Sequence, residues 1–130
     1  MAALILDASV LIGLLDNADA HHQRAVDDVE AADETSMDLI APASAYSEAM
    51  VAFARVARIR DAREAIAAMG IRVSPLDART AEHAAVLRAH HDRLRLPDAI
   101  VLATARELGG QLLSYDERLA HYATVHDPIA

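Results

Sequence analysis

The chain has 130 residues, 54% of them hydrophobic, which is enough for one domain with a core and too little for two ordinary domains. It has no cysteine, which excludes disulfides, thiol catalysis and cysteine-based zinc sites and favours a reducing cytoplasm. Its net charge of −8 argues against general adhesion to nucleic acid or anionic lipid, and no apolar run approaches the length of about 18 residues that spans a bilayer.

The chain begins with a short apolar run, Ala2–Leu6, which ends at an acid, Asp7. Such a run is typical of a strand buried on both faces of a parallel sheet. Asp7 then lies at the carboxyl edge of the sheet, where ligands bind in open α/β folds. Asp7 either caps a helix that starts near Ser9 or takes part in a ligand site, and this stretch alone leaves both readings open.

Strand and helix patterns alternate along the rest of the chain, and Pro97 is expected at the first position of its helix. Helices are predicted at about 9–17, 19–30, 44–58, 61–70, 77–94 and 97–108, and strands at 38–41, 71–73 and 112–115, with a further short edge strand at 122–126. This alternation predicts one domain over residues 1–130, an α/β three-layer sandwich with a mainly parallel sheet of four or five strands.

Two local patterns predict details of the helices in the middle of the chain. Asp61 followed by Glu64 resembles a capping box and places a helix start at Asp61. The helix at 44–58 is expected to bury a stripe of small and apolar residues and to leave Met50 and Phe53 outside it; the stripe is Ala45, Ala49, Ala52, Val56 and Ile59.

Four acids are candidates for a common site. Asp116 ends a predicted strand as Asp7 does, so both carboxylates reach one sheet edge if their strands are adjacent, while Glu48 and Asp98 lie early in helices. Taken singly, Glu48 and Asp98 need only complement a helix dipole. Together, four acids without a neighbouring base repel one another, and a divalent cation resolves that conflict. Oxygen ligands without histidine or cysteine favour Mg²⁺ or Mn²⁺.

With these motifs the chain resembles the PIN-domain nucleases, and among them the VapC-type toxins of bacterial toxin–antitoxin pairs. The motifs are Leu4–Ser9, Glu48, Leu96–Ala99 and Leu112–Asp116. The resemblance implies a metal-dependent endoribonuclease whose acidic quartet is Asp7, Glu48, Asp98 and Asp116, with Ser9 and Ser114 as hydroxyls near the metal and Glu117 as an alternative fourth acid. It also implies a homodimer that is silenced by a cognate antitoxin.

The predicted reaction is hydrolysis of RNA phosphodiesters by water activated at one or two Mg²⁺ ions, which Asp7, Asp98 and Asp116 hold, with Glu48 binding directly or through water. Single-stranded or looped RNA is the expected substrate. Four arginines either guide it or only form solvated helix faces, and the sequence assigns none of them a role: Arg55, Arg58, Arg93 and Arg95. The antitoxin is expected to lie along residues 46–59, with apolar contacts to Met50 and Phe53 and an arginine on the carboxylates. The alternative is an inactive PIN-like or receiver-like binding module, although a receiver site relies on a lysine and all 12 basic residues here are arginines.

Overall fold

A four-stranded parallel sheet forms the centre of the computed structural model, which describes residues 2–125 and residue 127. Its strands are β1 (Ala3–Leu6), β2 (Asp38–Pro42), β3 (Ile71–Ser74) and β4 (Gln111–Leu113), in the order β3-β2-β1-β4. The first apolar run is therefore a central strand, and β4 pairs directly with it. The predicted parallel α/β sheet is confirmed, and a helix connects each strand to the next, as parallel pairing requires.

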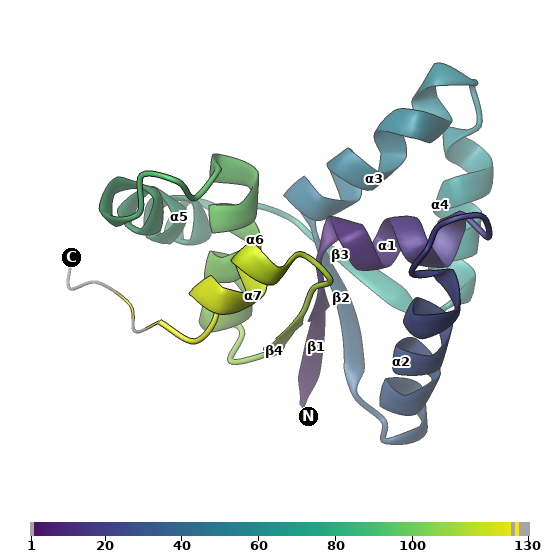
Figure 1. Cartoon of the computed structure of the whole chain (residues 1–130), viewed down its shortest axis with the longest axis horizontal. Helices are drawn as coiled ribbons and strands as arrows, with labels where there is room; N and C mark the ends of the chain where they lie inside the picture. Colours follow the sequence, from purple (N-terminus) through teal and green to yellow (C-terminus); the bar gives the residue numbers. More distant parts are fainter. Residues whose placement is uncertain (1, 126, 128–130) are drawn as a thin grey trace.

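Helices cover both sides of this sheet (Figure 1). Along the chain they are α1 (Ala8–Leu15), α2 (His22–Glu34), α3 (Ala43–Arg55), α4 (Ile59–Ala68), α5 (Ala78–His90), α6 (Leu96–Glu107) and α7 (Glu117–Tyr122). Figure 1 shows α5, α6 and α7 on one side of the strands and α1, α2 and α4 on the other. The Ser44 hydroxyl donates to the Pro97 carbonyl at 3.0 Å and so ties the starts of α3 and α6 together.

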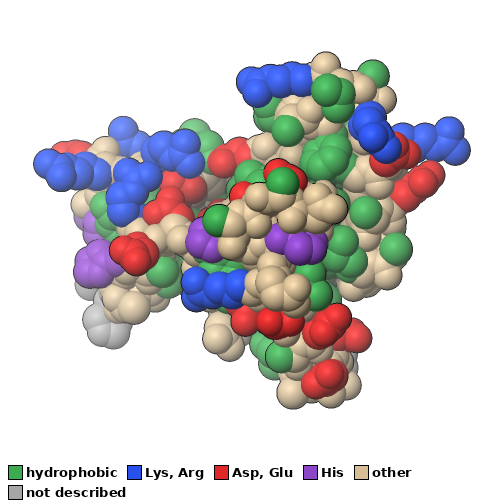
Figure 2. Space-filling view, turned by 45° about the vertical axis from the view of Figure 1, so that its right-hand side comes forward, with side chains coloured by type: hydrophobic (Ala, Val, Ile, Leu, Met, Phe, Trp, Pro, Cys, Tyr) green, Lys and Arg blue, Asp and Glu red, His purple; other side chains and the backbone are tan. Residues whose placement is uncertain are grey.

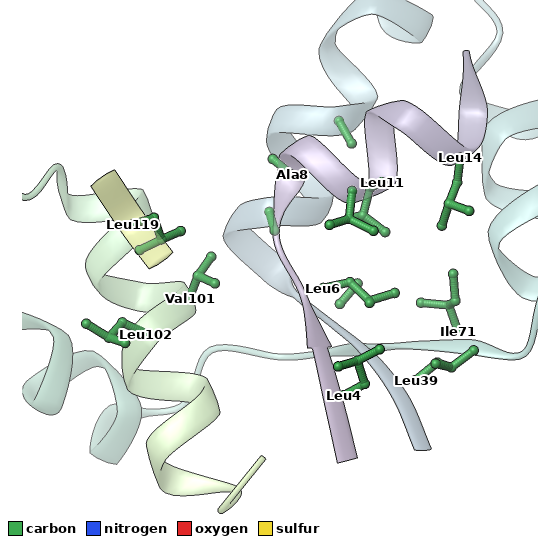
Figure 3. Close-up of a cluster of buried hydrophobic side chains, with 14 of the residues drawn as sticks. Leu4, Leu6, Ala8, Leu11, Leu14, Leu39, Ile71, Val101, Leu102 and Leu119 are labelled. Atoms are coloured by element: carbon green, nitrogen blue, oxygen red, sulfur yellow. The ribbon is translucent and has the colours of Figure 1, made fainter. Parts of the chain in front are cut away.

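Alternation along β1 builds a core on each face of the sheet. Leu4 and Leu6 pack with Leu11 and Leu14 of α1, as Figure 3 shows, whereas Ile5 joins Ala105 of α6 in a second cluster. Successive side chains of a strand point to opposite faces, so a strand covered on both sides has no polar position. This explains why β1 consists of apolar residues only.

The structure corrects the predicted boundary between the third and fourth helices. Helix α3 ends at Arg55, three residues early, because Ala57 adopts a positive φ of 58° that no helix can continue. Helix α4 then begins at Ile59, so Asp61 is not its cap. Asp61 lies in the first turn, where its carboxylate pairs with Arg58 at 2.9 Å.

Only two of the five residues in the core stripe expected for the helix at 44–58 are buried. Ala45 and Ala49 are buried, but Ala52, Val56 and Ile59 are exposed, with Val56 63% accessible. Met50, expected outside the core, is buried, whereas Phe53 is half-buried. Val56 and Ile59 lie beyond the end of α3 at Arg55, and the last turns of α3 project past the sheet (Figure 1).

Other boundaries differ by a few residues, and the predicted edge strand is wrong. Residues 117–122 form α7, and residues 123–125 do not form a strand; His126 lies outside the described residues. Pro97 occupies the second position of α6 rather than the first, and α2 starts at His22 instead of after an Asp19 cap. The Asp77 cap of α5 is present, with its carboxylate accepting from the Thr80 amide at 2.9 Å. No helix in residues 2–125 is long and apolar enough to cross a membrane.

Candidate active site

Asp7 is the buried centre of the candidate site. It follows β1 directly and is only 5% exposed. It occupies the cap position of α1, but its side chain makes no capping hydrogen bond. Its Oδ2 instead accepts hydrogen bonds from the hydroxyls of Ser9 at 3.1 Å and Ser114 at 2.8 Å. Of the two readings of Asp7, the geometry therefore favours a place in a polar cluster.

The two serines connect Asp7 to the segment after β4. The Ser9 hydroxyl accepts a hydrogen bond from the Tyr115 amide at 3.0 Å, and the Ser114 hydroxyl accepts one from the Asp116 amide at 3.1 Å. Each hydroxyl thus donates to the Asp7 carboxylate and accepts from the neighbouring backbone. This arrangement uses both hydrogen-bonding capacities of a hydroxyl group and fixes the position of Asp116 relative to Asp7.

Tyr115 anchors the same segment to α2. Its hydroxyl donates to Asp28 at 2.7 Å, and the Arg24 guanidinium lies 4.4 Å from the centre of its ring. Burial and the bond to Asp28 raise the pKa of the Tyr115 phenol, which stays protonated as a donor. The turn that carries Ser114 and Asp116 is therefore held from two sides.

Arg95 is the counter-ion that the sequence analysis did not identify. Its Nε lies 3.1 Å from Asp98 Oδ2, and its Nη2 lies 3.8 Å from Glu48 Oε2. The expectation of acids without a neighbouring base is therefore wrong. The spacing of Arg95 and Asp98, three residues apart across a helix start, was a usable signal, but the contact to Glu48 depends on how α3 packs beside α6.

Electrostatic coupling shows which acids lie near one another. Burial raises the pKa of the Asp7 carboxyl, the bond from Ser114 opposes this, and the nearby Asp98 charge adds to it. Burial also raises the pKa of Glu48; Arg95 opposes this effect, and the charges of Asp98 and Asp7 increase it. Asp7, Glu48 and Asp98 thus share one electrostatic environment, and Asp98 is only 8% exposed.

Asp116 is linked to this group less directly. It caps α7, with its Oδ1 accepting the Arg118 amide at 3.0 Å, and its charge helps to raise the pKa of Arg95. Glu117, the alternative fourth acid, is exposed in the first turn of α7. The structure leaves the choice between these two open.

The residues fit a divalent cation in kind, although their side chains are not at coordinating positions. Within residues 2–125 and 127 no three His, Asp or Glu side chains are grouped closely enough to hold a metal ion. The donors at the site are nevertheless carboxylate and hydroxyl oxygens, which suit Mg²⁺ or Mn²⁺. Arg95 now neutralises two of the carboxylates, so its guanidinium has to move when a cation binds there.

Comparisons with known proteins identify the family and the fold. A family model of the PIN domain matches residues 4–125. VapC20 of Mycobacterium tuberculosis, a toxin that cleaves the sarcin–ricin loop, is similar in structure, with a TM-score of 0.73, 21% identity, and 95% of this chain and 97% of that chain covered. A toxin–antitoxin complex from Klebsiella pneumoniae matches with a TM-score of 0.75, 23% identity, and 99% and 97% covered. No curated protein matches the sequence significantly. The two structural similarities concern the fold.

Proposed function

The chain belongs to the PIN domain family, and from this premise we propose that it is a Mg²⁺-dependent endoribonuclease and the toxin of a toxin–antitoxin pair. The observation that carries the proposal is the buried Asp7 carboxylate, which shares an electrostatic environment with Glu48 and Asp98 at the carboxyl edge of the sheet. PIN domains are typically nucleases, and the solved structures with this fold include a VapC toxin.

Each side chain has a defined role in this proposal. Asp7 and Asp98 hold the cation, Asp116 completes its ligands, and Glu48 binds directly or through water. The bound cation supplies an activated water and neutralises charge on the scissile phosphate. Ser9 and Ser114 keep the Asp7 carboxylate oriented by donating to its Oδ2. Arg95, once released from Asp98, is placed to contact the phosphate.

Purified protein and a labelled single-stranded RNA test this proposal directly. We expect cleavage with Mg²⁺ or Mn²⁺ and none with EDTA. Asp7→Asn should lower the rate by about a hundredfold or more, whereas Asp33→Asn, a change of an exposed acid on α2, should leave it unchanged. Cleavage that is insensitive to EDTA and to Asp7→Asn would exclude a metal-dependent mechanism. A protein that never cleaves but binds its antitoxin would be the inactive binding module instead.

The proposed antitoxin site is an apolar groove between α1, α3 and α4. Near the carboxylates it has a volume of about 300 Å³ and is lined by Ile12, Leu15, Asp16, Glu48, Ala49, Ala52, Phe53 and Val56. A second hollow of about 370 Å³ continues it along α4. The groove runs from exposed apolar side chains to Glu48, so a bound segment can place apolar anchors in it and an arginine on the carboxylates. The Klebsiella pneumoniae structure is a toxin–antitoxin complex, which supports a partner of this kind.

A homodimer is part of the same proposal. Exposed apolar side chains lie at the edge strand β3 and just after it, with Val73 36% and Leu76 45% accessible. Such surface is available for a second copy of the chain. Light scattering on the purified protein should give twice the mass of one chain, and a concentration-independent monomer mass would contradict this.

A further inference from the structure

A basic pocket adjoins the candidate active site on the side of α7. It has a volume of about 420 Å³ and is lined by Arg93, Glu117, Arg118, His121 and Tyr122. One wall is α7, and the other is the loop of residues 91–95 between α5 and α6. The volume is within the range of about 300–1,000 Å³ that is usual for small-ligand sites.

The pocket begins where the carboxylates of the candidate site end. Arg118 donates its amide to Asp116 Oδ1 at 3.0 Å, and its Nε lies 3.7 Å from the same oxygen. On the other wall, Arg93 lies two residues before Arg95 in the chain, and Arg95 pairs with Asp98. The pocket therefore adjoins the candidate site at Asp116.

The charge of the pocket is opposite to that of the whole chain. The net charge is −8, yet the described lining residues include two arginines against one acid, Glu117, although Arg118 also pairs with Asp116 at the edge of the pocket. Among the residues that the structure describes, Arg93 has no carboxylate within salt-bridge distance. Figure 2 shows basic side chains on several parts of this face of the molecule, including the part formed by the later helices, where acidic side chains lie among them. An unpaired arginine beside a second one suits a phosphate.

Aromatic rings complete the pocket. Tyr122 is half-buried, and its ring meets His91 edge to face, with centroids 5.1 Å apart. His121 lies beside it at 6.0 Å. These contacts hold α7 against the loop and leave ring surface facing the pocket. Bases of single-stranded RNA stack on aromatic rings irrespective of sequence.

We propose that this pocket binds one nucleotide of the RNA strand next to the scissile phosphate. Arg93 and Arg118 hold its phosphate, and Tyr122 with His121 stacks on its base. The inference rests on the proposed ribonuclease function and adds a substrate subsite outside the acidic quartet. It favours single-stranded RNA, because a base in a duplex is not free to stack on Tyr122.

RNA binding in EDTA tests the subsite without cleavage. Anisotropy of a fluorescently labelled single-stranded octanucleotide measures the affinity. Arg93→Ala with Arg118→Ala should weaken binding by about tenfold or more and reduce the salt dependence by about two ions. The control, Arg60→Ala with Arg63→Ala, removes two exposed arginines of α4 and should change affinity by less than about twofold. Tyr122→Leu should weaken binding by about fivefold or more with an unchanged salt dependence.

The outcomes separate the subsite from the nuclease itself. Thermal unfolding confirms that each variant is folded. Suppose that the variants of Arg93, Arg118 and Tyr122 bind RNA as tightly as the control and that the wild type cleaves RNA. The proposed subsite is then wrong, and the proposed ribonuclease function is unaffected. If the same variants lose antitoxin binding but keep RNA binding, the pocket is a protein interface and the inference is overturned. A wild type that neither binds nor cleaves RNA removes both proposals.

Discussion

At the scale of single residues, Asp7 combines burial with charge. A carboxylate that is 5% exposed needs hydrogen bonds or a cation, and two serine hydroxyls supply only part of that need. The remaining cost explains the raised pKa of Asp7. The metal-free protein thus carries an electrostatic strain at the place where a cation would relieve it.

We predict that Asp7→Asn in EDTA leaves the free energy of unfolding at pH 7 equal to that of the wild type or above it. Burial raises the pKa of Asp7 in the folded protein above its ordinary value of 3.8. The contribution of protonated Asp7 to the stability of the wild type is therefore fully present below pH 3.8 and is lost as the pH rises through the raised pKa. The advantage of asparagine should therefore be larger at pH 7 than at pH 4. Urea unfolding of both proteins at pH 4 and pH 7 measures this advantage. An advantage of Asp7→Asn that is smaller at pH 7 than at pH 4 would contradict the prediction.

Arg95 is predicted to compete with the cation. Its guanidinium pairs with Asp98 and approaches Glu48, so Arg95→Met frees both carboxylates. Mg²⁺ should then raise the melting temperature of the variant more than that of the wild type. Arg88→Met, which changes an exposed arginine on α5, is the matched control and should show the wild-type shift. Equal shifts in all three proteins would mean that Arg95 does not occupy the cation site.

At the scale of elements, β4 reaches its position because Gly110 lets it approach β1. A Cβ at Gly110 would lie 2.9 Å from Ile5 Cγ1 and 3.1 Å from the Ala3 carbonyl oxygen. The first contact is shorter than real Cβ atoms show, and the second is tighter than most of their contacts. The close pairing of β1 with β4 matters for the site, since Ser114 follows β4 directly and Asp116 lies two residues further along.

Gly110→Ala should therefore destabilise the fold by about 1–3 kcal/mol and reduce RNA cleavage as well. The extra methyl group has to push β4 away from Ile5, which moves Ser114 relative to Asp7. Gln111→Ala, at an exposed position next along the chain, should have little effect. Urea unfolding of both variants gives the comparison, and equal stabilities would show that the strand shifts without cost.

Helix α3 offers a test of the antitoxin groove. Val56, the residue directly after α3, is 63% exposed and lines the groove, whereas Val51 within α3 is 45% exposed and is not among the lining residues. Val56→Asp should weaken antitoxin binding by about tenfold or more, because it places a charge among the apolar anchors. Val51→Asp should bind normally. Copurification and calorimetry measure this, and the opposite pattern would move the interface to another face of α3.

At the scale of the whole molecule, cation binding should stabilise the native state by mass action. Mg²⁺ at about one hundred times its dissociation constant should add about 2.7 kcal/mol to the free energy of unfolding. Asp7→Asn should abolish this gain, because it removes a ligand from the buried centre of the site. Thermal unfolding across a Mg²⁺ titration measures it. A melting temperature that is indifferent to Mg²⁺ and Mn²⁺ would indicate a structural role for the acids.

The sequence by itself determined the sheet and the place of Asp7. An apolar run without a polar position, such as residues 2–6, requires cover on both faces, and this requirement is local enough to identify β1. Asp116 was expected to reach the same sheet edge as Asp7 if the strands before them were adjacent, and β4 does pair with β1. The start of a helix at Asp77 was predicted as well, and the structure shows that Asp77 caps it by accepting a hydrogen bond from the Thr80 amide, only three residues away.

Only the tertiary structure decided what surrounds those acids. Arg95 reaches Glu48 because α3 and α6 start side by side, a packing fixed by contacts such as Ser44 to Pro97, which are distant in sequence. The end of α3 depended on the backbone at Ala57, and the residues after α7, where an edge strand was predicted, form no strand through residue 125. Local patterns identify elements through neighbouring residues, whereas pairing across elements depends on packing that the chain acquires only when it folds.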